Sequence, residues 1–204
     1  MPSDKLPLNA AQITEAASSI WAAKGYRGSS LEDVAAVFGV TRQAIYHYYR
    51  DKESVLESVF SELFDKLEFA VKSARVSVTN QPDQFMAMYR AYLEVLASHR
   101  DAASIVMQEL GSLSGKRSDL YRARRRELHA LFVDSYHDGV ESGVLVPTPA
   151  DIAVPLLLGA ANWTYVWFTP QRAVTISELS DSMEQIIRGG LSVGSGMVAD
   201  ATSP

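Results

Sequence analysis

The sequence predicts an all-α protein with two parts, a three-helix N-terminal domain over residues 1–52 and a larger helical domain over residues 53–204. Three observations support this fold class. Residues 30–52 have the apolar spacing and turn residues of a helix-turn-helix. Most of the remaining chain carries apolar residues at helical spacing, without the alternation of a β-strand. Hydrophobic residues make up 47% of the chain, which is enough to build a sizeable core.

The first two helices have recognisable ends. Asn9 and Gln12 resemble a capping box, and apolar residues at helical spacing run from there towards Gly25. Ser30 is placed as the N-cap of the next helix. Gly39 ends that helix, because glycine takes a positive φ at low cost. The spacing therefore predicts two helices followed by a tight turn.

The third helix is the candidate for reading DNA. Thr41 is expected to cap it, with Ile45 and Tyr49 facing inward. In a helix-turn-helix, the first turns of the second helix meet base edges in the major groove. Arginine pairs with guanine, glutamine with adenine, and a small apolar group meets the thymine methyl. The residues on these turns are Arg42, Gln43, Ala44, Tyr46 and His47. The pattern predicts a protein that binds specific sequences of double-stranded DNA.

Residues 22–35 and 39–53 resemble the TetR family of one-component transcriptional regulators. The resemblance implies an all-helical homodimer, in which a variable C-terminal domain binds a ligand and forms the dimer. It also implies that Ser30 touches a phosphate. From the groove pairings, we expect Arg42 and Gln43 to supply most base discrimination. Tyr46 and Lys52 are expected mainly to position the duplex, since Lys52 opens the following helix, where a phosphate can bind. The full candidate set for contacts with the operator is Ser30, Thr41, Arg42, Gln43, Ala44, Tyr46, His47, Tyr48 and Lys52.

The charge distribution is unusual for a DNA-binding domain. The net charge is −5, and residues 1–60 contain six Lys or Arg against seven Asp or Glu. This departs from the basic footprint expected of such domains, although Arg42, Arg50 and Lys52 cluster around the third helix. By themselves these charges describe a solvated face. DNA affinity is then expected to rest on a few phosphate contacts per subunit and on dimerisation.

A series of helices follows the helix-turn-helix. An apolar stripe predicts one long helix from about residue 55 to 78 that links the two domains, and residues 79–82 stop it. Further helices are expected near residues 85–96 and 102–110, before a loop at residues 111–115.

A basic helix comes next. Residues 116–126 hold six of the nineteen Lys and Arg residues. The helical spacing places Arg124 and Arg125 at the edge of the buried face, whereas Arg122 and Arg126 should point outward. Two interpretations stay open: cations lying along a helix rim, or a clamp for a ligand carboxylate or phosphate.

The last two helices are strongly apolar. Thr148 is expected to cap a helix that continues to Phe168 and is apolar nearly all round, so it must be covered on both sides. Thr175 and Glu178 predict a capping box for the final helix. In the TetR family, the corresponding helices pair with their mates as a four-helix dimer interface.

Asn162 needs a partner inside this apolar helix, since an unpaired buried amide costs about 1–3 kcal/mol. It is either a satisfied core amide or part of a ligand pocket. Residues 158–170 also resemble a TetR subgroup that senses acyl-CoA thioesters. That resemblance offers Asn162, Trp163 and Trp167 as pocket residues, with Arg124 or Arg125 for a phosphate. A neutral aromatic effector that stacks on the tryptophans is the alternative.

Several function classes are disfavoured. The sequence has no Cys, so disulfides and zinc-thiolate sites are excluded, and the usual catalytic motifs are missing. Asp134 and His137 share a helix face, but one such pair is common by chance, so we expect no metal and no cofactor. The N-terminus lacks signal-peptide features, and the apolar run at residues 152–168 is short and interrupted. We therefore expect a soluble cytoplasmic protein without membrane contact.

The combined expectation is a ligand-responsive transcriptional regulator rather than an enzyme. It would repress from an operator and be released by an amphipathic effector such as an acyl-CoA. The alternatives are a regulator of the same fold that senses a neutral aromatic compound, and an architectural DNA-binding protein without an effector.

Overall fold

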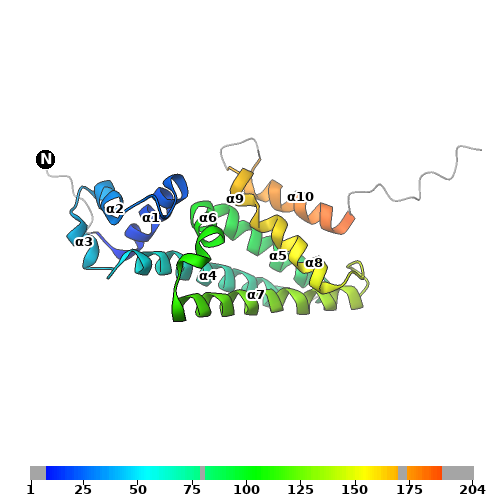
Figure 1. Cartoon of the computed structure of the whole chain (residues 1–204). Helices are drawn as coiled ribbons and strands as arrows, with labels where there is room; N and C mark the ends of the chain where they lie inside the picture. The colour runs from blue at the N-terminus through cyan, green and yellow to red at the C-terminus, as the bar shows by residue number, and fades with distance from the viewer. Residues whose placement is uncertain (1–7, 79–80, 170–173, 190–204) are drawn as a thin grey trace, which may run out of the picture.

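The computed structural model describes residues 8–78, 81–169 and 174–189 (Figure 1). This part of the chain is helical and contains no strand, so the predicted fold class is confirmed. The elements are α1 (Ala10–Lys24), α2 (Leu31–Phe38), α3 (Arg42–Tyr46), α4 (Lys52–Ser77), α5 (Gln81–Ser98), α6 (Arg100–Glu109), the 3-10 turn η1 (Leu110–Ser112), α7 (Gly115–Glu141), α8 (Ala150–Asn162), α9 (Thr164–Trp167) and α10 (Ile176–Gly189).

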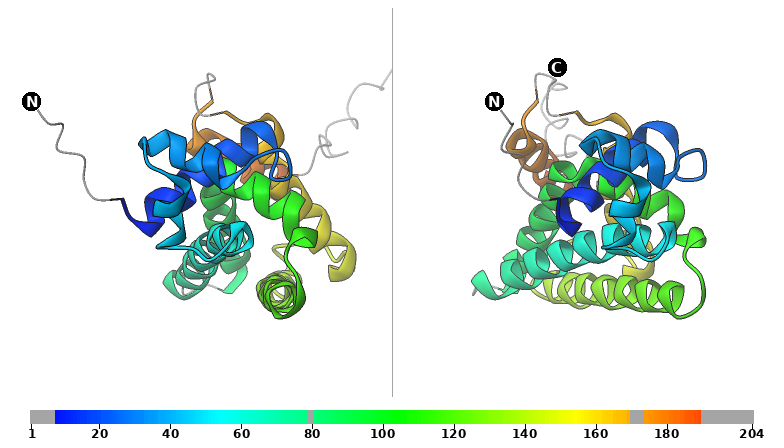
Figure 2. Two further views of the ribbon diagram at one scale, coloured as in Figure 1. Left: turned by 60° about the vertical axis from the view of Figure 1, so that its left-hand side comes forward. Right: turned by 90° about the vertical axis from the view of Figure 1, so that its left-hand side faces the viewer.

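Helices α1–α3 form one end of the molecule, and α4 runs from them under the larger domain (Figure 1). Helices α4 and α7 lie along one side, and α10 lies on the side opposite α7 in both views of Figure 2. Helix α5 packs against α4, α7, α8 and α10 and is therefore the centre of the larger domain. In the described residues, the structure has no helix that is both long and apolar enough to cross a bilayer.

The predicted ends of α1 and α2 are confirmed. Asn9 Oδ1 accepts from Gln12 N at 2.9 Å, and Gln12 Oε1 accepts from Asn9 N at 3.1 Å, which completes a capping box. Ser30 caps α2 in the same way with Asp33. Gly39 adopts φ 65° and ψ 30°, the left-handed conformation that ends α2 and starts the turn into α3.

The long linking helix is confirmed as α4. Asp51 and Ser54 form a capping box at its start, a feature that the apolar stripe did not indicate. Helix α4 ends at Ser77, and the stop predicted over residues 79–82 falls on residues 79 and 80, which lie outside the described part, and on the first residues of α5. The predicted boundary between residues 52 and 53 lies in the first turn of α4. Helix α4 packs against both α1 and α5 and therefore links the two domains.

The single helix predicted from Thr148 to Phe168 is wrong in two respects. The N-cap position is Pro149, without a side-chain cap. The helix also breaks after Asn162, and the short α9 follows. At the break, the Thr164 hydroxyl donates to the Ala161 carbonyl at 2.8 Å, and such a local bond competes with the helix ladder.

Candidate functional site

Helix α3 presents the predicted base-reading residues on one surface. Ile45 is fully buried in the hydrophobic core, and α3 packs against α2. The outer side carries the exposed Thr41, Arg42, Gln43, His47 and Tyr48, with Ala44 and Tyr46 half-buried beside them. The Thr41 side chain makes no capping hydrogen bond, contrary to expectation, so its hydroxyl is not used by the helix. This set stays the predicted DNA contact surface.

Tyr49, just after the end of α3, is held by its hydroxyl group. Its hydroxyl lies 2.8 Å from Thr14 Oγ1 and 3.0 Å from Ser58 Oγ, and it donates to the Ala10 carbonyl at 3.2 Å. Tyr48 donates to the Leu8 carbonyl. The hydroxyls of Tyr48 and Tyr49 therefore tie the end of the reading helix to Leu8, α1 and α4, in addition to the buried Ile45.

Arg42 is paired within the protein. Its Nη1 lies 2.7 Å from Glu32 Oε1, its Nη2 contacts the Tyr46 hydroxyl, and its guanidinium carbon lies 5.1 Å from the centre of the Tyr46 ring. Glu32 was not among the residues expected from the sequence. The sequence signal that could have identified it is an acidic residue in the first turn of the preceding helix, ten residues before an exposed arginine.

Lys52 faces inward in the structure, and its expected contact with a phosphate stays a prediction. Its Nζ donates to the Tyr26 carbonyl and, at 2.5 Å, to the Ser29 carbonyl. The ammonium also lies 4.2 Å from the centre of the Tyr26 ring and 5.8 Å from that of Trp21. Burial lowers the pKa of Lys52 and raises the pKa of Tyr26 to about 12. The first turn of α4 faces the loop between α1 and α2, so the amine fixes that loop.

Residues of the larger domain also contact the first turns of α4. Glu53 Oε1 accepts from both the backbone nitrogen and the hydroxyl of Ser114 at 2.9 Å. Arg117 Nε lies 2.6 Å from Glu57 Oε2, and its Nη1 lies 3.5 Å from Glu53 Oε1. The Ser114 bonds, followed by Arg117, lower the pKa of Glu53. Hydrogen bonds and ion pairs therefore join the start of α7 to the first turns of α4, next to the DNA-reading domain.

A cavity of about 580 Å³ lies between α4, α5, α6, α7 and α8. Its size falls within the range usual for small-molecule sites. The apolar lining comes from Phe60, Phe64, Leu67, Val106, Met107, Leu110, Leu128, Pro155, Leu158 and Gly159. Three basic or titratable residues of α7, Arg125, Arg126 and His129, line the same cavity, and Arg125 and Arg126 are exposed. The site therefore combines an apolar interior with a cationic edge.

Asn162 has a specific partner in this cavity. Tyr92 on α5 donates its hydroxyl hydrogen to Asn162 Oδ1 at 2.6 Å, and both residues line the cavity. Burial raises the pKa of Tyr92, so the phenol stays protonated and acts as a donor. The amide is a satisfied hydrogen-bond acceptor and a cavity residue at once, which unites the two interpretations of its role.

Three of the predicted ligand residues lie elsewhere. Arg124 pairs with Asp65 at 2.6 Å and Glu68 at 2.7 Å, so α4 has already neutralised it, and it does not line the cavity. Trp163 and Trp167 are 59% and 48% exposed on the outer surface. Arg126, expected to point outward, lines the cavity beside Arg125. The apolar spacing of α7 could not fix which neighbouring arginines face the cavity to better than about one residue. Asp65 and Glu68 on α4 pair with Arg124, which leaves Arg125 and Arg126 at the cavity.

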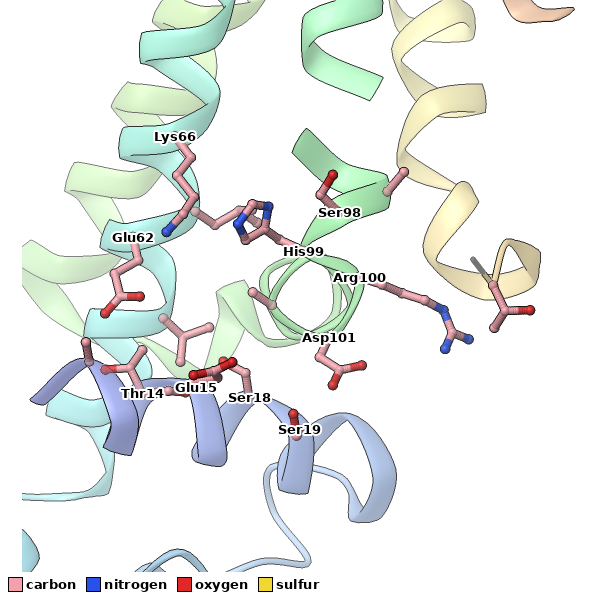
Figure 3. Close-up of a pocket in the computed structure, with 16 residues that line it drawn as sticks. Thr14, Glu15, Ser18, Ser19, Glu62, Lys66, Ser98, His99, Arg100 and Asp101 are labelled. Atoms are coloured by element: carbon pink, nitrogen blue, oxygen red, sulfur yellow. The ribbon is translucent and has the colours of Figure 1, made fainter. Parts of the chain in front are cut away.

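A second, polar cleft of about 540 Å³ separates the two domains (Figure 3). It is lined by Glu15, Ser18 and Ser19 of α1, by Glu62 and Lys66 of α4, and by residues 98–102 where α5 meets α6. Helix α6 starts in this cleft against α1, whereas its residues Val106 and Met107 line the apolar cavity. One helix therefore touches both the cavity and the DNA-reading domain.

The outer face of α8–α10 is apolar and exposed. Its large exposed residues are Ile152, Leu156, Trp163, Val166, Trp167, Val174 and Ile186. Exposed apolar patches generally mark interaction sites. Within the described ranges, no group of three or more His, Asp or Glu residues is arranged to hold a metal, and the Asp134–His137 pair gains no third ligand there.

These features define a helix-turn-helix regulator with a ligand-sized cavity behind its DNA-reading end. Residues 13–59 match the family described as bacterial regulatory proteins, tetR family. Residues 78–191 match the family described as tetracyclin repressor-like, C-terminal domain. The chain belongs to the TetR family of DNA-binding transcriptional repressors. Members bind operator DNA and small-molecule effectors, act as dimers, and are regulators rather than enzymes.

Named relatives span nearly the whole chain. The repressor SCO4008 of Streptomyces coelicolor is 29% identical over 192 residues, covering 94% of this chain and 89% of the relative. The repressor KstR2 of Mycobacterium tuberculosis is 22% identical over 185 residues, covering 88% and 91%. The structure of KstR2, described as a ketosteroid transcriptional regulator, matches with a TM-score of 0.85 at 20% identity, covering 93% of this chain and 98% of that one.

A further solved structure is AibR in complex with isovaleryl coenzyme A and operator DNA. It matches with a TM-score of 0.78 at 23% identity and covers 88% of this chain and 97% of that one. At these identities the structural likenesses establish the fold.

Proposed function

We propose that this repressor leaves its operator when an acyl-CoA thioester, or an anion of similar amphipathic form, binds in the cavity of α4–α8. The observation that carries the proposal is the junction of an apolar interior with Arg125, Arg126 and His129 at its edge. An acyl group fits the apolar part, and the arginines meet phosphates through charge-assisted hydrogen bonds. The likeness to AibR, which was solved with isovaleryl coenzyme A, supports the same class of ligand.

The Tyr92–Asn162 pair supplies polarity where a thioester would lie. Asn162 Oδ1 accepts from the Tyr92 hydroxyl, so the amide nitrogen is the group of this side chain that can donate to a ligand. A carbonyl oxygen is the acceptor that suits this donor. An apolar ligand would leave the donor without a partner, which disfavours a pure hydrocarbon.

The placement of the tryptophans weakens the rival effector class. A neutral aromatic compound would stack on Trp163 and Trp167, but both are exposed and lie outside the cavity. The architectural alternative is weakened too, since DNA packaging does not require a ligand-sized apolar cavity.

Two contacts offer routes from the cavity to the DNA-reading end. Helix α6 lines the cavity and packs on α1. Leu110 also lines the cavity, just before Ser114, which holds Glu53 in the first turn of α4. A ligand that favours the DNA-incompetent arrangement by only ~1.4 kcal/mol weakens operator affinity tenfold.

We further propose that two subunits pair through the exposed face of α8–α10 and read a near-palindrome with the outer residues of α3. The predicted contact set is retained, and Lys52 also serves the loop between α1 and α2. Two recognition helices in a dimer then set the spacing of the half-sites.

Calorimetric titration tests the effector directly. Acyl-CoAs of several chain lengths are compared with free coenzyme A, free fatty acids and neutral aromatic compounds. Arg125→Ala should weaken acyl-CoA binding about tenfold or more through loss of a charge-assisted contact. Arg124→Ala is the matched control on the same helix: it removes the pairs with Asp65 and Glu68 and should lower stability while leaving acyl-CoA affinity within about twofold. Equal affinity for acyl-CoA in wild type and Arg125→Ala, or no binding of any thioester, would overturn the proposal.

A further inference from the structure

Arg100, the first residue of α6, is joined to α9 by a hydrogen bond. Its Nε donates to the Tyr165 carbonyl at 2.7 Å, and its side chain extends from the start of α6 towards α9 (Figure 3). Carbonyls in the last turn of a helix have no partner within that helix, and α9 ends at Trp167. Arg100 therefore supplies the donor that this end of α9 needs. Because the guanidinium is charged, the bond is stronger than one between neutral groups.

Helix α6 contacts both α9 and the DNA-reading domain. It packs against α9 and against α1. Its first residues, including the half-buried Arg100, line the polar cleft that also contains Glu15 and Ser18 of α1. The hydrogen bond of Arg100 therefore connects the helix beside α1 to the end of the helix pair α8–α9.

The break between α8 and α9 lies directly after a cavity residue. Asn162 is the last residue of α8 and lines the cavity. Trp163 follows with φ −72° and ψ −12°, and Val166 N donates to its carbonyl at 3.0 Å, a bond that spans only three residues. Tight turns of this kind inside a helical segment often act as hinges.

Local sequence preference does not explain this break. The apolar spacing alone predicts an unbroken helix across Asn162, so contacts with other helices are needed to hold the broken arrangement. Tyr92 on α5 holds Asn162 at 2.6 Å, on the near side of the break. Arg100 on α6 holds Tyr165 on the far side. The angle between α8 and α9 is thus set by two residues outside both helices.

We propose that Arg100 is a positioning residue for the response to the effector, because it makes α6 follow α9 when a ligand in the cavity engages Asn162. The inference rests on the proposed binding of an acyl-CoA in that cavity. A ligand oxygen that accepts from the Asn162 amide acts on the residue before the break, and α9 turns relative to α8. Arg100 then carries the start of α6 with α9 and changes the contact of α6 with α1. This route is separate from the one through Ser114 and Glu53.

The test removes the hydrogen bond and measures ligand affinity and operator release separately. Arg100→Met keeps most of the apolar stem and lacks the donor. Calorimetry on the DNA-free protein should give an acyl-CoA affinity within about twofold of wild type, since Arg100 lies outside the cavity. Fluorescence anisotropy should show that saturating acyl-CoA weakens operator binding by roughly tenfold in wild type and by less than about threefold in Arg100→Met. Because coupling is reciprocal, bound operator should weaken acyl-CoA binding by the same reduced factor in the variant.

Two further variants make the comparison specific. Arg122→Met is the matched control, because Arg122 is exposed on α7 and its Nε donates only to Ser118 of the same helix, at 3.1 Å. It should release operator as wild type does. Asn162→Ala should also reduce release at saturating acyl-CoA, and adding Arg100→Met should reduce it no further, because both residues act on one route. Circular dichroism and sedimentation establish that each variant is folded and dimeric, and Arg100→Gln replaces Arg100→Met if the latter is not.

Three results would overturn the proposal. Full operator release by Arg100→Met would mean that the cavity acts on α1 without this hydrogen bond. An acyl-CoA affinity reduced well beyond twofold would mean that Arg100 maintains the cavity itself. Separate, additive losses in Asn162→Ala and Arg100→Met would mean that the two residues act on different routes. If wild type binds no thioester, or keeps its operator when saturated, the proposed function fails first and the role of Arg100 falls with it.

Discussion

Asp33 fixes the first turn of α2, the helix that precedes the reading helix. Its carboxylate accepts from the Ser30 backbone nitrogen at 2.8 Å and lies 3.1 Å from Lys24 Nζ. The hydrogen bonds from the Ser30 side chain and backbone, followed by Lys24, lower the pKa of Asp33 from 3.8 to about 2. The folded protein therefore prefers the ionised carboxylate more strongly than the unfolded chain does.

A pH dependence follows from this shift. Because the folded pKa lies below the unfolded value, the stabilisation is complete above the unfolded pKa and is lost as the pH falls through the folded pKa, between about 5 and about 2. Asp33→Asn should melt below wild type at neutral pH, and the difference in melting temperature should shrink through that window. Thermal melts of both proteins at several pH values check this. A difference independent of pH would contradict the assignment.

Lys52 makes part-buried contacts within the protein, where a contact with a phosphate was expected. Its ammonium supplies two carbonyls of the loop between α1 and α2 and lies against Tyr26 and Trp21. Lys52→Met keeps most of the apolar stem and removes the donor. The free energy of unfolding should fall by about 1–2 kcal/mol because the carbonyls lose their partner.

The salt dependence of operator binding tells the two roles of Lys52 apart. If the amine serves the loop, Lys52→Met should leave the salt slope unchanged even where affinity falls. If the amine reached a phosphate, the slope would flatten by about one per subunit. Arg42→Ala is the matching comparison, because we expect it to relax preference at one base position by roughly tenfold.

At the scale of elements, the contact between the start of α7 and the first turn of α4 joins the effector domain to the DNA-reading domain. Glu53 receives two hydrogen bonds from Ser114, close to the cavity residue Leu110. Glu53→Ala should leave acyl-CoA affinity within about twofold of wild type and reduce the release of operator that acyl-CoA causes, because coupling needs a contact between the sites. Calorimetry and anisotropy measure the two quantities separately.

The exposed Glu127 on α7 offers the control for that experiment, since Glu127→Ala removes a carboxylate from solvent. It should behave as wild type in both assays. Unchanged operator release by Glu53→Ala would leave α6 as the route between the sites.

The elements differ in how far the sequence alone could predict them. Apolar periodicity and caps at Asn9, Ser30 and Thr175 were sufficient for α1, α2 and the start of α10, because those signals are local. The break between α8 and α9 was not predicted, since it depends on which acceptor the Thr164 hydroxyl takes. The cavity arginines were only half predicted: the acids that neutralise Arg124 come from α4, more than fifty residues away in sequence.

At the scale of the whole molecule, the apolar face of α8–α10 is the surface that a second subunit would cover. Leu156 on α8 belongs to this face and is 68% exposed. Leu156→Asp should weaken dimerisation by roughly tenfold or more, because it would place a charge in an apolar interface. Val76→Asp on α4, where Val76 is 81% exposed, is the matched control and should stay dimeric. Sedimentation velocity distinguishes them, and two dimeric variants would place the interface elsewhere.

The proposed function requires that acyl-CoA in the cavity controls operator binding. The most direct measurement is the operator affinity of the full chain at constant salt, with and without a saturating acyl-CoA. We expect affinity to fall tenfold or more, a coupling of about 1.4 kcal/mol or larger, with free fatty acids and neutral aromatic compounds much less effective. Arg125→Ala should shift the same response to higher acyl-CoA concentration. Tight operator binding that no acyl-CoA alters, at concentrations where binding to the protein is saturated, would contradict the account.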